Sequence, residues 1–200
     1  MKKIAVFGGS FNPPLNSHFS LAEEILNEVD DVEKILFVPV SINYEKAGLI
    51  SNENRYEMLK LVCDKNDKFD VSNIELIHEE QLHTYETLKL LQEQYTENEI
   101  IFILGTDNLK ELYWWKDIDK LLSEFKILVI ARDNDNIDEI IDSQDILKKY
   151  RNSFIKYNQQ IRTNTSASYV RKCFLNGKST KYLMPYEVYD YIIKNNLYRG

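Results

Sequence analysis

The chain has 200 residues, and an apolar share of 44% is enough to bury the core of one globular domain. It carries 25 Lys and Arg residues against 32 Asp and Glu, a formal net charge of −7, which leaves no overall positive field for wrapping nucleic acid. We therefore expect small-molecule partners and no nucleic acid. The two cysteines, Cys63 and Cys173, lie far apart in no zinc-like spacing, so they predict neither a disulfide framework nor a metal site.

The amino terminus does not have the pattern of a secretory leader. Only four apolar residues, Ile4 to Phe7, separate Lys3 from Gly8-Gly9, which is too short for the apolar core of a signal peptide. No other run approaches the length of a membrane span. We predict a cytoplasmic protein with no membrane partner, and the sequence leaves a homo-oligomer open.

Six short apolar runs alternate along the chain with longer segments of helical spacing. The runs are residues 4–7, 35–38, 69–72, 100–104, 127–131 and 154–157. Continuous apolar runs are typical of strands covered on both faces, as in a parallel sheet between helices. Helices are expected over 19–29, over 88–95 and, after Pro185, at the end of the chain, while the acidic stretch 133–145 predicts a surface excursion. The fold class predicted is α/β, with a doubly wound, mostly parallel sheet in a single domain over residues 1–200.

The most informative segment follows the first run and reads Phe-Gly-Gly-Ser-Phe-Asn-Pro-Pro-Leu-Asn-Ser-His over residues 7–18. The carboxyl edge of a parallel sheet is where a ligand crevice opens. Gly8 and Gly9 let a ligand approach the backbone, and the N-terminus of the helix that follows attracts phosphate, with His18 in its first turn. Taken singly, each of these residues would merely shape a strand-to-helix loop. The whole string is far more specific.

This string resembles the signature of the nicotinate-nucleotide adenylyltransferases in the nucleotidyltransferase superfamily, G-G-S-F-D/N-P-P followed by H/T-x-G-H. Residues 8–14 match throughout, but Leu15 stands where the family has His or Thr, and Ser17 where it has Gly. The resemblance implies a Rossmann-like nucleotidyltransferase fold. The residues that it implies here are Gly8, Gly9, Ser10, Phe11 and His18 for ATP and Asn12 for nicotinate mononucleotide.

Two segments resemble the acceptor side of the family. Glu45-Lys46 stands where the family has His-Lys, and the resemblance implies that Lys46 contacts substrate phosphates. Residues 84–88 resemble T-x-D-T-L, a helix start that implies Thr84 and Tyr85 as contacts of the pyridine ring and its carboxylate. Free N–H groups at a helix start suit a carboxylate, although a plain capped helix with Leu88 in the core would explain the same residues.

Two more segments resemble the family further along the chain. Residues 102–115 are similar to F-I-I-G-A-D followed by L-x-x-W, which implies Gly105 and Asp107 for ATP and Trp115 for the nicotinate ring, while Trp114 is expected in the core. Residues 165–171 are similar to I-S-S-T-x-I-R, which implies ATP contacts from Ser166, Ser168 and Arg171 at a helix start. An ordinary capped helix would explain the serines equally well.

The resemblance implies transfer of AMP from ATP to nicotinate mononucleotide, giving deamido-NAD and pyrophosphate in NAD biosynthesis. His18, Lys46 and Arg171 are the implied catalytic residues and cations, and Mg²⁺ would enter with ATP, with no protein metal ligands assigned. Because a leucine donates no hydrogen bond, Leu15 removes one donor, and we hypothesise that the amide of Asn16 replaces it. Two alternatives stay open: an adenylyl or cytidylyl transferase acting on another phosphorylated acceptor, and a weakly active or inactive nucleotide-binding paralogue.

Overall fold

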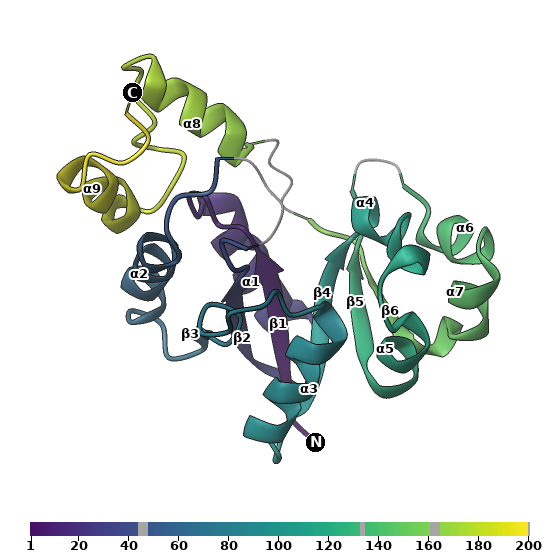
Figure 1. The fold of residues 1–200 in the computed structure, drawn as a ribbon. Helices are drawn as coiled ribbons and strands as arrows, with labels where there is room; N and C mark the ends of the chain where they lie inside the picture. Colours follow the sequence, from purple (N-terminus) through teal and green to yellow (C-terminus); the bar gives the residue numbers. More distant parts are fainter. Residues whose placement is uncertain (44–47, 133–134, 161–164, 200) are drawn as a thin grey trace.

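A six-stranded sheet lies at the centre of the protein, and all of its strands run parallel, in the order β3-β2-β1-β4-β5-β6 (Figure 1). The computed structural model describes residues 1–43, 48–132, 135–160 and 165–199. The strands are β1 (Lys3–Gly9), β2 (Val32–Pro39), β3 (Phe69–Val71), β4 (Glu99–Gly105), β5 (Lys126–Ile130) and β6 (Phe154–Tyr157). Every predicted apolar run therefore forms a strand, and the predicted doubly wound α/β fold is confirmed.

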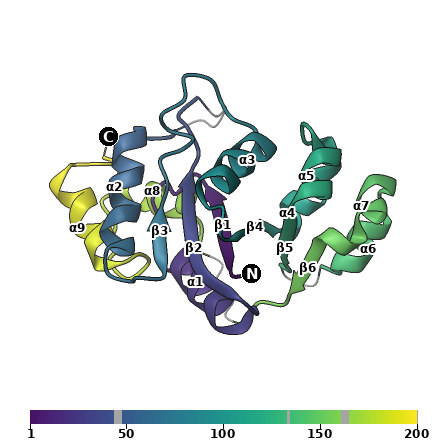
Figure 2. The same ribbon diagram turned by 90° about the horizontal axis from the view of Figure 1, so that it is seen from below.

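Helices cover both faces of the sheet (Figures 1 and 2). One face packs on α1 (Asn16–Glu28) and α2 (Asn52–Cys63), with Phe37 at the centre of its core. The other face, whose core contains Phe102, is covered by a longer series of helical segments. These are α3 (Thr84–Gln94), α4 (Thr106–Leu109), η1 (Leu112–Trp114), α5 (Ile118–Glu124), α6 (Ile137–Asp142), α7 (Asp145–Lys149) and η2 (Arg151–Ser153). Because both faces are buried, the strands lack the polar alternation of a half-exposed sheet.

Two C-terminal helices pack beside α2, at one side of the sheet (Figure 1). They are α8 (Ala167–Leu175) and α9 (Tyr186–Lys194), and Pro185 stands directly before α9, at its N-cap. Together with α2 and the start of α1 they bury a separate apolar group, called here the C-terminal cluster. Its buried members are Leu15, Met58, Val170, Phe174, Met184, Val188 and Ile192.

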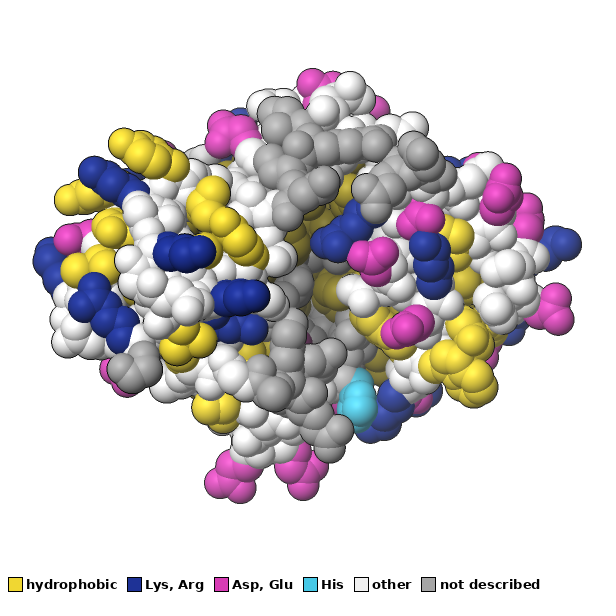
Figure 3. All heavy atoms as spheres, turned by 90° about the horizontal axis from the view of Figure 1, so that it is seen from above, with side chains coloured by type: hydrophobic (Ala, Val, Ile, Leu, Met, Phe, Trp, Pro, Cys, Tyr) yellow, Lys and Arg dark blue, Asp and Glu magenta, His cyan; other side chains and the backbone are white. Residues whose placement is uncertain are grey.

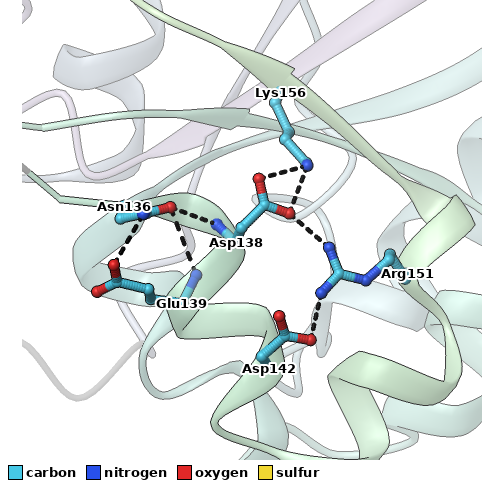
Figure 4. Close-up of polar contacts among 6 residues, drawn as sticks. All are labelled: Asn136, Asp138, Glu139, Asp142, Arg151 and Lys156. Atoms are coloured by element: carbon cyan, nitrogen blue, oxygen red, sulfur yellow. Dashed lines mark hydrogen bonds and ion pairs between the residues drawn. The ribbon is translucent and has the colours of Figure 1, made fainter.

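The acidic stretch that was expected as a surface excursion forms α6, which presents its charges outward and buries Ile137 and Ile141 in the core. Two cations hold these charges (Figure 4): Arg151 binds both Asp138 and Asp142, and the ammonium of Lys156 binds Asp138. Each of these acids already has a cationic partner within the protein. The charges of Asp138 and Asp142 are therefore paired locally, while Glu139 accepts a hydrogen bond from the amide of Asn136.

The chain reverses its direction of travel across the sheet after β3. It starts at β1, moves outward to β2 and β3, and then returns to place β4 on the other side of β1. In open α/β sheets, ligands bind outside the carboxyl ends of the strands at this switch point. Here those ends carry Gly8 and Gly9 on β1 and Gly105 on β4.

Candidate active site

A cleft of about 630 Å³ opens at the switch point. Figure 3 looks onto the carboxyl edge of the sheet and shows a hollow between its two halves, with Lys and Arg side chains on both flanks. The cleft is walled by the ends of β1, β4 and β5, by the start of α1 and by the segment before α8. Its lining includes Gly8, Gly9, Ser10, Phe11, Asn12, His18, Gly105, Asp107, Arg132, Gln159 and Ser166. Most of the predicted ATP residues, distant in sequence, are thus brought together.

The phosphate loop, defined here as residues 8–12, forms the floor beside β1. A Cβ on Gly9 would lie 3.0 Å from Cζ of Phe11, and one on Gly8 would lie 3.2 Å from Cε2 of Phe102. A side chain at either position would therefore crowd an aromatic ring, which would have to shift by a few tenths of an ångström to admit it. Phe11 itself has a φ of 42°, in the left-handed region that aromatic residues rarely adopt.

His18 is held in one tautomer by the backbone of the loop. Its Nδ1 accepts the N–H of Leu15 at 2.9 Å, so in the neutral ring the proton lies on Nε2 and can be donated. Burial, and secondarily the positive charge of Arg132, lower the pKa of His18 to about 4. A pKa this low disfavours the charged imidazole at neutral pH, which argues against the expectation that His18 is a cation. Its side chain lines the cleft as a neutral donor.

Leu15 does not face the cleft as a replacement for the family histidine. Its side chain is 1% exposed and belongs to the C-terminal cluster. Asn16 is exposed, and its amide donates to the carbonyl of Tyr182 at 3.0 Å. Neither residue lines the cleft, so the structure gives no support to the hypothesis that the Asn16 amide replaces a lost phosphate donor.

Asn12 joins four segments of the chain. Its Nδ2 donates to the carbonyl of Gly48 at 2.7 Å, and its Oδ1 accepts the Tyr198 hydroxyl at 2.7 Å and, more weakly, the Ile50 N–H at 3.5 Å. Its backbone carbonyl accepts from Nη1 of Arg171 at 2.8 Å. Asn12 is 1% exposed. Both polar atoms of its side chain thus have protein partners, and these hydrogen bonds fix the end of the phosphate loop to the rest of the protein.

The start of α8 contributes to the cleft only in part. Ser166 lines it, and the Ser166 hydroxyl caps the helix by accepting the N–H of Tyr169 at 3.2 Å. Ser168 and Arg171 do not line the cleft: Nη2 of Arg171 lies 3.5 Å from Oγ of Ser168, while its Nη1 holds the phosphate loop. Arg171 therefore contacts the backbone of the phosphate loop, whereas the sequence predicts that it contacts ATP in the cleft.

On the opposite wall, Asp107 and Arg132 form an ion pair at the mouth of the cleft. The Nη1–Oδ2 distance is 2.8 Å, and both side chains are mostly exposed. The guanidinium lies over Gly105, where a Cβ would come within 3.3 Å of Nε. Among the cleft-lining residues that the structure describes, Arg132 is the one Lys or Arg.

Of the described residues expected to contact the acceptor, Asn12 lines this cleft, whereas Thr84, Tyr85 and Trp115 do not. Tyr85 and Trp115 pack against the core on the α3 face, where Tyr85 bonds to Glu124 and Trp115 meets the ring of Phe102, with 6.3 Å between centroids. Thr84 is the first residue of α3. The expectation for Trp114 is wrong, since its side chain is 78% exposed. Lys46 and Glu45 lie outside the described residues.

Phe102 connects the two sides of the site. Its ring lies beneath Gly8 of the phosphate loop and also contacts Trp115. The start of α3 is fixed from below, because the hydroxyl of Thr87 donates to the carboxyl of Glu75 at 2.8 Å. Burial raises the pKa of Glu75 to about 7, against the lowering effects of that hydrogen bond and of the charge of Arg55.

Sequence reasoning missed Arg132 and Gln159. Both follow strands: Arg132 comes two residues after β5 and Gln159 two residues after β6. The rule that located Gly105, position at the carboxyl end of a parallel strand, would have found both.

No helix in the described part of the chain is long and apolar enough to cross a membrane.

Comparisons with known proteins agree on one family. Residues 6–173 match the family model described as cytidylyltransferase-like. A probable nicotinate-nucleotide adenylyltransferase of Carboxydothermus hydrogenoformans is 33% identical, over 98% of each chain, and one of Clostridium tetani is 30% identical over the whole of both. The solved structure of the Plasmodium falciparum nicotinic acid mononucleotide adenylyltransferase complexed with NaAD superposes with a TM-score of 0.80 at 28% identity, covering 99% of this chain and 98% of that one.

Proposed function

This chain belongs to the cytidylyltransferase-like family and, within it, to the nicotinate-nucleotide adenylyltransferases, and we propose that its cleft transfers AMP from ATP to nicotinate mononucleotide. The family resemblance and enzyme class inferred from the sequence are confirmed. One observation carries the proposal for this chain: the phosphate loop, the Nε2–H of His18 and Arg132 meet in one cleft at the switch point of the sheet. We further propose that residues 1–200 act as a single nucleotidyltransferase domain.

The reaction needs no nucleophile from the protein. A phosphate oxygen of nicotinate mononucleotide attacks the α-phosphorus of ATP, a new P–O bond forms, the bond to the α,β-bridging oxygen breaks, and pyrophosphate leaves with the electron pair. Catalysis then consists of positioning and of stabilising charge on the departing pyrophosphate. We propose that backbone N–H groups of the loop, His18 and the cationic Arg132, which all line the cleft, supply these functions.

Magnesium is proposed as part of the substrate. Among the described residues no three His, Cys, Asp or Glu side chains gather in a way that could hold a metal ion. We propose that the ion arrives with ATP and is held by phosphate oxygens and water, as Mg²⁺ commonly is at phosphate-binding sites. Lys46 as a phosphate ligand, Thr84, Tyr85 and Trp115 as acceptor contacts, and a cytoplasmic location stay predictions from the sequence.

Pyrophosphate release tests the proposal. With ATP and Mg²⁺ we expect release with nicotinate mononucleotide, slower release with its amide counterpart, and none without an acceptor. The His18→Ala variant should lose roughly 10²–10³ in turnover, the usual effect of removing one such donor, whereas His78→Ala, a change at an exposed histidine, should not. Release only with a different phosphorylated acceptor, or binding of ATP without release with any acceptor, would contradict the proposal in favour of the two alternatives.

A further inference from the structure

Arg55 lies wholly buried behind the phosphate loop, and the proposed function does not use it. It is 0% exposed and stands in the first turn of α2. Its guanidinium donates from Nε to the carbonyl of Ile50 at 3.2 Å, from Nη1 to the carbonyl of Ser10 at 3.1 Å and from Nη2 to Oδ1 of Asn52 at 2.7 Å. Within the described parts of the chain no carboxylate lies at ion-pair distance from it.

The bond to Ser10 fixes the orientation of a whole peptide unit. The Ser10–Phe11 peptide is trans, and in a trans peptide the C=O and the following N–H point in opposite directions. Because the Ser10 carbonyl points toward the buried Arg55, the N–H of Phe11 points the other way. Ser10 and Phe11 both line the cleft.

The N–H of Phe11 has no acceptor in the described part of the protein. The hydrogen bonds of the loop reach other groups, and none is donated by this amide. A backbone N–H without a protein partner is unusual, and beside a cleft it is satisfied by water or by a ligand. The left-handed backbone of Phe11 is held in place by its ring, which packs edge-on against Phe7 and His18.

We propose that Arg55 is a positioning residue for ATP: by holding the Ser10 carbonyl on the buried side, it directs the Phe11 N–H into the cleft as a donor to a phosphate oxygen. This rests on the proposed function in so far as ATP is the nucleotide bound. The guanidinium also places a permanent positive charge behind the loop, since Arg remains protonated in proteins. The competing explanation is that Arg55 only ties together the loop, residues 50–52 and α2.

Ligand binding by the Arg55→Lys variant separates the two explanations. Lysine keeps the charge but cannot reproduce the planar fork that reaches three acceptors. We would titrate it calorimetrically with an ATP analogue carrying a methylene bridge between the α- and β-phosphorus, and with adenosine. The stoichiometry of binding gives the fraction of the protein that is folded, and Kd gives the affinity of the folded site for the ligand. We expect the Kd of the analogue to rise at least tenfold at unchanged stoichiometry, with the Kd of adenosine unchanged.

A matched control is Arg151→Lys, in which an arginine with two acidic partners far from the cleft is changed in the same way. It should leave both Kd values as in the unmodified protein. An unchanged Kd for the analogue in Arg55→Lys would overturn the proposal. So would an equal loss for the analogue and adenosine, because that is the result of a merely structural role.

A measurement on the unmodified protein covers the case in which Arg55→Lys does not fold. Labelling with ¹⁵N-phenylalanine gives nine amide signals, one of them from Phe11. We expect that signal to move downfield with the ATP analogue and to stay in place with adenosine. An unchanged chemical shift of the Phe11 amide on addition of the analogue would refute the inference. None of these measurements uses nicotinate mononucleotide, so a failure of transfer to that acceptor would not be confused with a failure of this proposal.

Discussion

Leu15 provides the sharpest test of how this site departs from the family signature. If the residue belongs to the core, as its burial among Met58, Val170 and Phe174 indicates, then Leu15→Ala removes packing and no catalytic group. Truncating a fully buried leucine costs about 2–5 kcal/mol. Taking about 3 kcal/mol, and roughly 2–4 °C per kcal/mol for a chain of this size, the Tm should fall by about 6–12 °C.

Activity of the folded Leu15→Ala protein should stay within about threefold of the unmodified enzyme. The reason is that His18 is held by the backbone N–H of Leu15, which the substitution keeps. Circular dichroism during heating and pyrophosphate release at a temperature well below both transitions would measure the two effects. An unchanged Tm would refute the packing argument directly.

The reverse substitution, Leu15→His, asks whether the family histidine can be restored. An imidazole at this position would enter an apolar cluster, and burying a polar ring without a partner is unfavourable. We expect lower stability and no gain in turnover. A gain of tenfold or more at unchanged Tm would show that the side chain at this position reaches the phosphates, and would overturn the placement of Leu15.

Three further substitutions test other contacts of the site. In Tyr198→Phe, Oδ1 of Asn12 keeps only the weak contact with Ile50, so stability should fall by about 1–3 kcal/mol in urea unfolding, whereas Tyr189→Phe, which removes a hydroxyl with no hydrogen bond among the described residues, should be neutral. Because the pKa of Glu75 is higher in the folded protein than in the unfolded chain, the folded state binds more protons between about pH 4.5 and 7. Stability from this group is present at low pH and lost as pH rises through about 7; Glu75→Gln should reduce this slope, and an identical slope in both proteins would contradict it. The pKa of His18 is lower in the folded protein than in the unfolded chain. The free energy of unfolding should therefore decrease as the pH is lowered from about 6.5 to 4, and His18→Asn should remove that decrease.

Much of the fold could be predicted because its signals are local. A strand buried on both faces must be apolar along its length, and four of the six runs meet this condition. The other two form the edge strands β3 and β6, which contain Asp70 and Lys156. The position of the phosphate loop also follows from local order, since a Gly-Gly pair ends the first strand and a helix follows. Position at the carboxyl end of a parallel strand also predicts Gly105 and Asp107, which lie at the end of β4 and just after it and line the cleft.

The contacts that could not be predicted join residues far apart in the chain. Asn12 is bonded to Arg171 and Tyr198, which lie 159 and 186 positions away. No periodicity within a single helix indicates such a pairing, so Asn12 and Arg171 were expected to face the substrates directly. The error over Trp114 has a different origin: residues 112–114 form a 3₁₀ turn in place of an α-helix, and Trp114 extends into solvent while Trp115 packs inward.

The charge of the protein explains how an acidic chain can hold two anionic nucleotides. Asp138 and Asp142 of α6 are bound by Arg151 and Lys156, and Asp107 is bound by Arg132. The lowered pKa of His18 disfavours a positive charge on its ring at neutral pH. In the described part of the cleft, attraction for phosphate therefore depends on one exposed arginine and on oriented N–H groups. Donors of this kind act over short distances, which makes the orientation of the phosphate loop, and the buried groups that set it, more important to this site than the net charge of the chain.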